Sequence, residues 1–149
     1  MENSPSLQLR EASLAELLWL HERIPEFPGK ASLSFYEDRL QYRLSLALVA
    51  LLDGELAGFK VGYQSELPEQ FYSWMGGVRP EFRRKGIATA LAVEQEIWAK
   101  EEGFRAVFFK TRNRFLGMIQ FGIERGFKVV DLLPKGGVKD YRIVMRKEL

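Results

Sequence analysis

The spacing of apolar residues changes at Pro80, and this change constrains the fold more than any other feature of the sequence. Before Pro80, apolar runs of strand length are separated by turns, and the run at 46–52 is followed by Asp53-Gly54, a dipeptide typical of two-residue hairpins. After Pro80, apolar residues recur at helical spacing, and these segments alternate with short apolar runs. Strands joined first by hairpins and then through helices predict a mixed α/β sheet with helices on both faces.

Local signals mark the ends of several predicted elements. Ser13 with Glu16 three residues later predicts a capping box at the start of the first helix, and Gly103 and Gly126 are expected to end the last two helices. We expect strands at 7–10, 46–52, 55–64, 71–78 (interrupted by Gly76-Gly77), 106–110, 127–133 and 141–147, and helices from Ser13, Ser34, Ile87 and Phe115. The inner faces are expected to carry Phe35, Leu40 and Leu44 in the second helix and Ile87, Ala90, Leu91, Ile97 and Trp98 in the third.

Composition excludes several kinds of site. The 149 residues suit a single domain over 1–149, and a chain of this length buries a sizeable core. It contains no cysteine, which excludes disulfides, thiolate metal sites and cysteine nucleophiles. Its single histidine, His21, excludes a multi-histidine metal site, and we expect this side chain to be half-exposed on the first helix. No metal is therefore predicted.

The sequence also argues against membrane and nucleic-acid partners. The longest apolar run covers 46–52, far short of the roughly 20 residues that span a bilayer. The N-terminus lacks the basic and apolar regions of a signal peptide, so we expect a soluble, cytoplasmic protein. The net charge is only +2, which does not suit a general nucleic-acid-binding protein.

A basic run precedes the predicted third helix. The first amides of a helix have no intrahelical acceptor and lie at the positive end of its dipole, so they attract anions. Gly86 allows an anion to approach the backbone, Ala88 keeps the next position small, and residues 83–85 supply three positive charges. This pattern favours an oligophosphate site that is neither a GxxxxGK[ST] loop nor a GxGxxG loop. A tight helix entry with a solvated basic turn is the simpler alternative.

The wider motif resembles a known coenzyme-binding signature. Residues 83–88 read R-R-K-G-I-A, which is similar to the [QR]-x-x-G-x-[GA] signature of the GNAT-type N-acetyltransferase superfamily. Val78-Arg79-Pro80 precedes it, and Asn113 and Arg125-Gly126-Phe127 follow where that family has an asparagine and a GF pair. The order of predicted elements also fits. The resemblance implies a GNAT domain over 1–149 with a mixed, largely antiparallel sheet, two splayed parallel strands and acetyl-coenzyme A (acetyl-CoA) as cosubstrate.

The same resemblance implies where coenzyme A (CoA) binds. Amides from Arg84 to Thr89 would hold the pyrophosphate, and the 71–78 strand would pair with the pantetheine arm where a bulge at Gly76-Gly77 splays the sheet. Asn113 would open the second CoA-contacting helix. Ordinary core packing is the alternative for Phe115 and Met118. The expected CoA-binding residues are Met75, Gly76, Val78, Arg83, Arg84, Lys85, Gly86, Ile87, Ala88, Thr89, Asn113, Phe115, Met118 and Phe121.

The catalytic pattern departs from the family. Gly122 occupies the position where many members have a tyrosine that protonates the departing thiolate, and we expect this glycine to leave room at the thioester end. Glu69 is the candidate general base, with an idle surface carboxylate as the alternative. Either the thiolate leaves without a proton donor, or Tyr72, Ser73 or Tyr141 donates the proton. The implied reaction is direct attack by a primary amine of a small molecule or peptide.

Two further expectations concern partners. A non-catalytic acyl-CoA-binding or sensing domain is the alternative to an enzyme, because the tyrosine is missing at Gly122. Exposed strands near the C-terminus are common docking edges, which would allow a homodimer.

Overall fold

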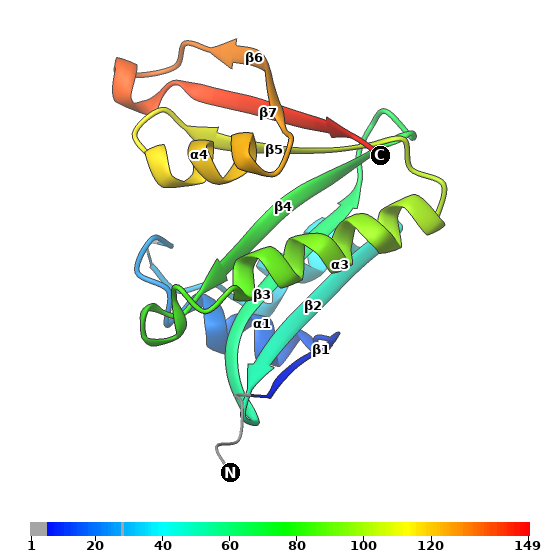
Figure 1. The fold of residues 1–149 in the computed structure, drawn as a ribbon, viewed down its shortest axis with the longest axis vertical. Coiled ribbons are helices and arrows are strands. Elements are labelled where there is room, and N and C mark those ends of the chain that lie inside the picture. The colour runs from blue at the N-terminus through cyan, green and yellow to red at the C-terminus, as the bar shows by residue number, and fades with distance from the viewer. Residues whose placement is uncertain (1–5, 28) are drawn as a thin grey trace.

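The fold is built on one mixed, largely antiparallel sheet, as predicted. The computed structural model describes residues 6–27 and 29–149. The strand order is β1-β2-β3-β4-β5-β7-β6, and every neighbouring pair is antiparallel except β4 and β5 (Figure 1). The strands are β1 (Leu7–Glu11), β2 (Ser45–Leu52), β3 (Glu55–Gln64), β4 (Gln70–Val78), β5 (Ala106–Arg112), β6 (Lys128–Leu133) and β7 (Arg142–Glu148).

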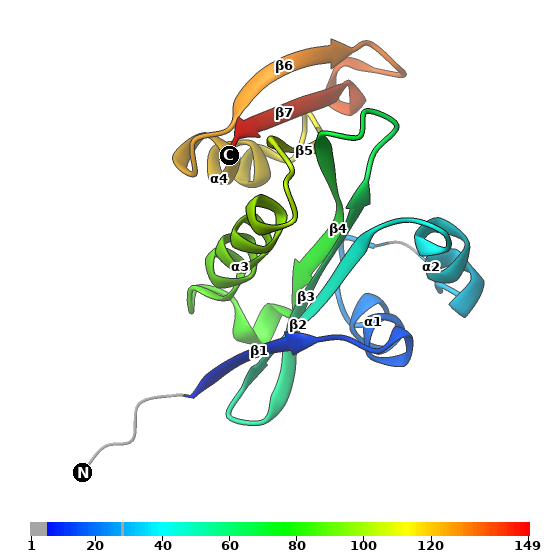
Figure 2. The same cartoon turned by 90° about the vertical axis from the view of Figure 1, so that its right-hand side faces the viewer.

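Helices cover both faces of this sheet (Figure 2). Leu17, Leu20 and Tyr36 form one core with β2 and β3, whereas Ile87 and Leu91 belong to a second core on the opposite face. This arrangement confirms the predicted layers. The helices are α1 (Leu14–His21), α2 (Leu33–Leu40), α3 (Ile87–Glu101) and α4 (Leu116–Glu124), with short 3₁₀ helices η1 (Pro80–Phe82) and η2 (Val138–Asp140).

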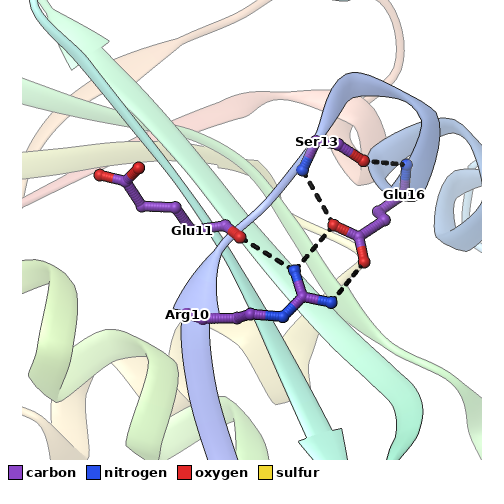
Figure 3. Close-up of polar contacts among 4 residues, drawn as sticks. All are labelled: Arg10, Glu11, Ser13 and Glu16. Atoms are coloured by element: carbon purple, nitrogen blue, oxygen red, sulfur yellow. Dashed lines mark hydrogen bonds and ion pairs between the residues drawn. The ribbon is translucent and has the colours of Figure 1, made fainter.

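The predicted capping box at the start of α1 is present (Figure 3). The Glu16 amide donates to the Ser13 hydroxyl, and the Glu16 carboxylate accepts from the Ser13 amide at 2.9 Å. Arg10 on β1 donates two hydrogen bonds to the same carboxylate, at 2.9 and 2.6 Å. These bonds hold the pKa of Glu16 at about 2 and join the edge strand to the first helix.

Turn signals in the sequence also predicted the structure well. Asp53 and Gly54 both have positive φ, which is the conformation that a tight hairpin between β2 and β3 requires. Gly103 follows α3 with φ 96°, and Gly126 follows α4 with φ 91°. Each prediction depended on residues next to the turn itself, and each is confirmed.

The predicted inner faces of two helices were partly wrong. The second helix begins one residue earlier than expected and ends at Leu40, because Gln41 is extended and Tyr42 is left-handed. Leu44 therefore lies outside the helix and is exposed, as is Phe35, while Tyr36 is the buried residue of α2. In α3, Ile97 is exposed, and the buried stripe at four-residue spacing consists of Ile87, Leu91, Gln95 and Ala99.

The parallel pair β4/β5 is short. It runs only from Gln70 opposite Ala106 to Tyr72 opposite Phe108, and beyond Tyr72 the described residues of β4 have no partner on the β5 side. The pairing of β4 with β3 shifts between Met75 and Ser73, which makes Trp74 the extra residue of a β-bulge next to this divergence. The strands separate as expected.

The bulge does not lie at Gly76-Gly77, where we expected it. These glycines pair regularly with Lys60 and Phe59 of β3, and the strand is not interrupted there. Close packing explains Gly77, because a Cβ on it would lie 2.9 Å from Ile24 Cδ1. Beyond the bulge at Trp74, the gap between β4 and β5 is therefore bordered by a regular part of β4 with little side-chain bulk at two successive positions.

Candidate active site

The N-terminus of α3 presents free backbone amides. Its N-cap, Gly86, is left-handed with φ 77°, and no side chain caps the helix. The first intrahelical hydrogen bond runs from the Ala90 amide to the Gly86 carbonyl, so the preceding amides have no acceptor within the helix. A helix of 15 residues adds a positive dipole at this end. The arrangement suits an anionic group.

The surroundings of these amides are open. Gly86, Ala88 and Thr89 are exposed, and a Cβ placed on Gly86 would meet no atom within 4 Å. Ile87 differs, because its side chain is buried in the core under α3. Ile87 can therefore contribute to an anion site only through its amide, while its side chain anchors the helix.

The three basic residues before α3 have different roles. Arg84 and Lys85 are exposed beside the free amides. Arg83 instead donates through Nε to the Val78 carbonyl at 3.0 Å, and its Nη2 contacts both carboxylate oxygens of Glu26 at 2.8 Å. Arg83, which was expected near the phosphates together with Arg84 and Lys85, therefore also connects the end of β4 to the loop after α1.

The β4 residues expected to contact pantetheine lie along the gap between β4 and β5. Met75, Gly76 and Val78 all follow Tyr72, the last residue of β4 that pairs with β5. Met75 packs against the core under α1 and α2, whereas Val78 packs against the core under α3. The strand backbone between these two contacts can accept an extended ligand as an added strand.

The residues expected to contact CoA from the second helix do not share one environment. Asn113 does not cap α4, because Phe115 is the N-cap. The Asn113 side chain donates to the Val138 carbonyl at 3.2 Å, and its amide donates to the Tyr141 carbonyl at 2.9 Å, so it fixes the η2 loop. The remaining members differ in exposure: Met118 packs against the core, Phe121 is half-buried and Phe115 is exposed.

The structure does not bring Glu69 to the gap. Glu69 directly precedes β4 at the end where β4 and β5 are paired, about 13 Å of strand from Ser73, where the gap begins. Its carboxylate is exposed and lies 3.9 Å from Arg105 Nε. Glu69 is therefore an exposed residue that pairs with Arg105 at the end of the sheet where β4 and β5 are joined, not at the gap.

Tyr72, in contrast, lies where the two strands separate. Its ring stacks on Phe108 across the last parallel pair, with centroids 4.8 Å apart and planes 7° from parallel, and it meets Tyr63 edge-on. Burial raises the pKa of its hydroxyl. Of the two predicted catalytic residues, only Tyr72 lies at the gap.

An aromatic cluster lies on the α1–α2 face. His21 is 6% exposed, not half-exposed as expected, and its Nδ1 lies 2.8 Å from the Tyr36 hydroxyl. The rings of Phe27, Phe35 and Tyr36 surround it. Burial lowers the pKa of His21, so the neutral imidazole is favoured in the folded chain.

This histidine predicts a pH-dependent stability. Below the usual histidine pKa of about 6.5, the unfolded chain binds a proton before folded His21 does, so the free energy of unfolding should fall as pH decreases through that window. The slope for one proton is at most about 1.4 kcal/mol per pH unit. Urea titrations from pH 7 to 5 should show the fall, and His21→Phe should flatten it. If the free energy of unfolding of His21→Phe fell with pH as steeply as that of the wild type, a group other than His21 would take up the proton.

Gly122 is explained by packing. It is buried in α4, and a Cβ on it would lie 2.8 Å from Phe109 Cζ and 3.1 Å from the sulfur and terminal methyl of Met145. The helix therefore lies directly against β5 and β7 at this point. The expected extra room for an acyl chain is not there, because the Phe109 ring fills the space beside the glycine.

Sequence reasoning missed a charged cluster between α3 and α4. Glu96 on α3 accepts from Arg125 Nη2 at 2.7 Å and from Lys147 Nζ on β7. Burial lowers the pKa of Lys60 on β3, and Glu96 and Arg125 act on the same ammonium. A lysine between Phe59 and Val61 in an apolar strand was the available signal.

Comparison with known proteins identifies the family. Residues 13–127 match the acetyltransferase (GNAT) family, so the chain belongs to it. A comparison with curated proteins found no match. Within the described residues, no helix is long and apolar enough to cross a membrane, and no group of three or more histidine, aspartate or glutamate side chains is placed to hold a metal.

Solved structures show the same fold. The ribosomal-protein-S18-alanine N-acetyltransferase from Escherichia coli has a TM-score of 0.81 at 15% identity, with 96% of this chain and 94% of that chain covered. Ard1 from Thermoplasma volcanium has a TM-score of 0.80 at 21% identity, covering 96% and 97%. The PaiA N-acetyltransferase from Thermoplasma acidophilum, solved with coenzyme A, has a TM-score of 0.74 at 20% identity, covering 97% and 99%.

Proposed function

We propose that this chain is an acetyl-CoA-dependent N-acetyltransferase that acts on a primary amine. The observation that carries the proposal is the continuity between the unpaired part of β4 and the uncapped N-terminus of α3, which are separated only by η1. The α3 amides with Arg84 and Lys85 would bind the pyrophosphate. The backbone from Met75 to Val78 would pair with the pantetheine arm and carry the thioester into the gap.

In the proposed reaction, the neutral amine attacks the thioester carbonyl directly. Holding amine and thioester together supplies much of the rate. The C–S bond then breaks, the electron pair passes to sulfur, and the attacking nitrogen loses a proton to water. No metal takes part in this scheme.

The acceptor would approach from the α1–α2 face, where Tyr72 and the aromatic cluster lie. Trp74 meets Phe35 and Tyr63 there, and Arg39 lies over its ring. This surface fits a small-molecule or peptide amine with an apolar portion. Homodimer formation, the absence of a nucleic-acid partner and a cytoplasmic location stay predictions.

The second candidate function is a non-catalytic acyl-CoA-binding domain. It is favoured by Gly122, since the packing of Phe109 there removes the usual position of a proton-donating tyrosine. Both functions require CoA binding, and only the first requires CoA release. A panel of spermidine, 2-phenylethylamine, a lysine-containing peptide and a peptide with a free α-amino group, with thiol release as the readout, separates them.

Acetyl-CoA should stabilise the folded chain. Because a ligand that binds only the folded state adds RT ln(1 + [L]/Kd), a concentration of about 100 times Kd should raise the free energy of unfolding by roughly 2.7 kcal/mol. Differential scanning fluorimetry over a concentration series measures this, and adenosine serves as the control that lacks the pyrophosphate. A melting temperature that does not move at millimolar acetyl-CoA would exclude both candidate functions.

A further inference from the structure

Lys60 lies in the middle of β3 and faces α3. Its neighbours Phe59 and Val61 belong to the core under α1 and α2, so the alternation of the strand directs Lys60 to the other face. It pairs with Gly76 of β4, and a Cβ on Gly76 would lie 3.4 Å from Lys60 Cγ. Because Gly76 has no side chain, the lysine stem lies against β4 beside the gap.

Two charged side chains act on the Lys60 ammonium. Glu96 is on α3, the helix toward which the strand alternation directs Lys60, and Arg125 follows α4. Glu96 is already bound by Arg125 and by Lys147 of β7. Two cations therefore share this carboxylate, and Lys60 is a third cation that it influences.

This cluster has more donors than acceptors. Arg125 Nε is buried and finds no acceptor among the described residues. Of the ion pairs formed by residues 6–27 and 29–149, none includes Lys60. Lys60 thus lies against the part of β4 that has no β5 partner, and its ammonium has no direct counter-ion among the described residues, which suits a group on which negative charge develops.

We propose that Lys60 is the catalytic acid that protonates the departing thiolate of CoA. The inference rests on the proposed function and adds the proton donor that Gly122 does not provide. As the C–S bond of the tetrahedral intermediate breaks, its electron pair passes to sulfur, and one Lys60 N–H bond breaks to form the S–H bond. Lys60 is left neutral and regains a proton from water. The acceptor nitrogen releases one proton to water, so the reaction of a neutral amine frees no net proton.

The acidity of Lys60 fits this step. Burial, with Arg125 acting in the same direction and Glu96 opposing it, lowers the pKa of Lys60 to about 8, close to the roughly 8.5 of a free thiol. The ammonium therefore predominates at neutral pH and still donates readily. Tyr72 is less suited to the step, because it meets Tyr63, whose side chain lies on the face of β3 opposite to Lys60.

The test uses hydroxylamine as the probe amine, because its nitrogen is unprotonated above neutral pH. Thiol release from acetyl-CoA, corrected for the reaction without protein, should decline above about pH 8 in the wild type. Lys60→Met should lower kcat by about 100-fold at pH 7, within the usual range for a general acid, and remove the alkaline decline. Lys60→Arg keeps the positive charge without the titration and should be similarly slow.

Coenzyme binding separates this inference from the proposed function. Titration calorimetry with desulfo-CoA should give wild-type and Lys60→Met dissociation constants within about threefold of each other. Loss of binding only in Lys60→Met would make Lys60 a binding residue and overturn the acid role. Absence of binding or of turnover with every amine in the wild type would overturn the proposed function itself.

Chemical rescue is specific here because the chain has no cysteine. Lys60→Cys alkylated with 2-bromoethylamine regains an ammonium at nearly the same position, and kcat should recover at least tenfold. Because the thioether sulfur makes this ammonium more acidic than that of lysine, the alkaline decline should occur at lower pH. Alkylation with iodoacetamide, which adds no ammonium, should give no recovery. Equal recovery with both reagents, or acetylation of Lys60 Nζ detected by mass spectrometry at the rate of turnover, would overturn the proposal.

Discussion

Ala88→Glu is expected to weaken acetyl-CoA binding by more than 100-fold. Ala88 is exposed in the first turn of α3, beside the free amides that would hold the pyrophosphate. A new carboxylate about 5 Å from a phosphate charge costs about 3 kcal/mol at an effective dielectric constant near 20. Titration calorimetry at low and high salt measures the loss, and salt should partly reverse it.

The control for this substitution is Ala88→Gln, which has the same size without the charge and should lose no more than about threefold in affinity. Stability should move in the other direction, because a glutamate at this end of α3 complements the helix dipole by about 0.3–1 kcal/mol. A glutamate variant that is more stable but does not bind coenzyme would assign the effect to charge at the site. Equal losses in both variants would show that steric fit, not the amides and dipole, controls binding.

Gly122→Tyr is expected to destabilise the fold by about 3 kcal/mol and not to restore an acid group. The new side chain would enter the contact between α4 and the β5/β7 pair, where even a Cβ lies 2.8 Å from Phe109. For a chain of this size, the loss corresponds to a fall in melting temperature of roughly 6–12 °C. Thermal and urea unfolding measure the change.

Gly117 offers a matched control in the same helix. A Cβ on Gly117 would meet nothing within 4 Å, so Gly117→Ala should gain up to about 1 kcal/mol from helix propensity alone. Gly122→Ala receives the same propensity gain but must displace Phe109 or Met145, and it should be less stable than wild type. If both alanine variants were stabilised equally, packing would not be the reason for Gly122.

The sequence predicted those features of the fold that local chemistry determines. Ser13 caps α1, and Asp53-Gly54 forms the hairpin, because each depends only on residues within a few positions. The buried face of α3 was less predictable. Gln95 is buried although it was not predicted on the inner face, and Ile97 is exposed although it was, because contact with the sheet decides which face is covered. The bulge at Trp74 likewise depends on register with β3, which is a long-range property.

The same distinction explains the predictions at the site. The uncapped N-terminus of α3, the candidate anion site, could be predicted from a short run of sequence, since the glycine and the basic residues all lie within it. Glu69 was assigned by nearness in sequence to β4, but the parallel pairing places it at the closed end of the gap. Arg83 was taken as a ligand contact, and only the fold shows that Glu26 binds it. Glu96 on α3 meets Lys147 on β7 and influences Lys60 on β3, an arrangement that no local motif encodes.

The short contact between β4 and β5 has a mechanical consequence. Three residue pairs form the seam between two half-sheets, β1 to β4 and β5-β7-β6 (Figure 2). A molecule that pairs with β4 beyond Tyr72 and also contacts α4 would bridge the two half-sheets. Opening of one half-sheet relative to the other would then become rarer, and amide hydrogen exchange would slow in strands that the bound molecule never touches.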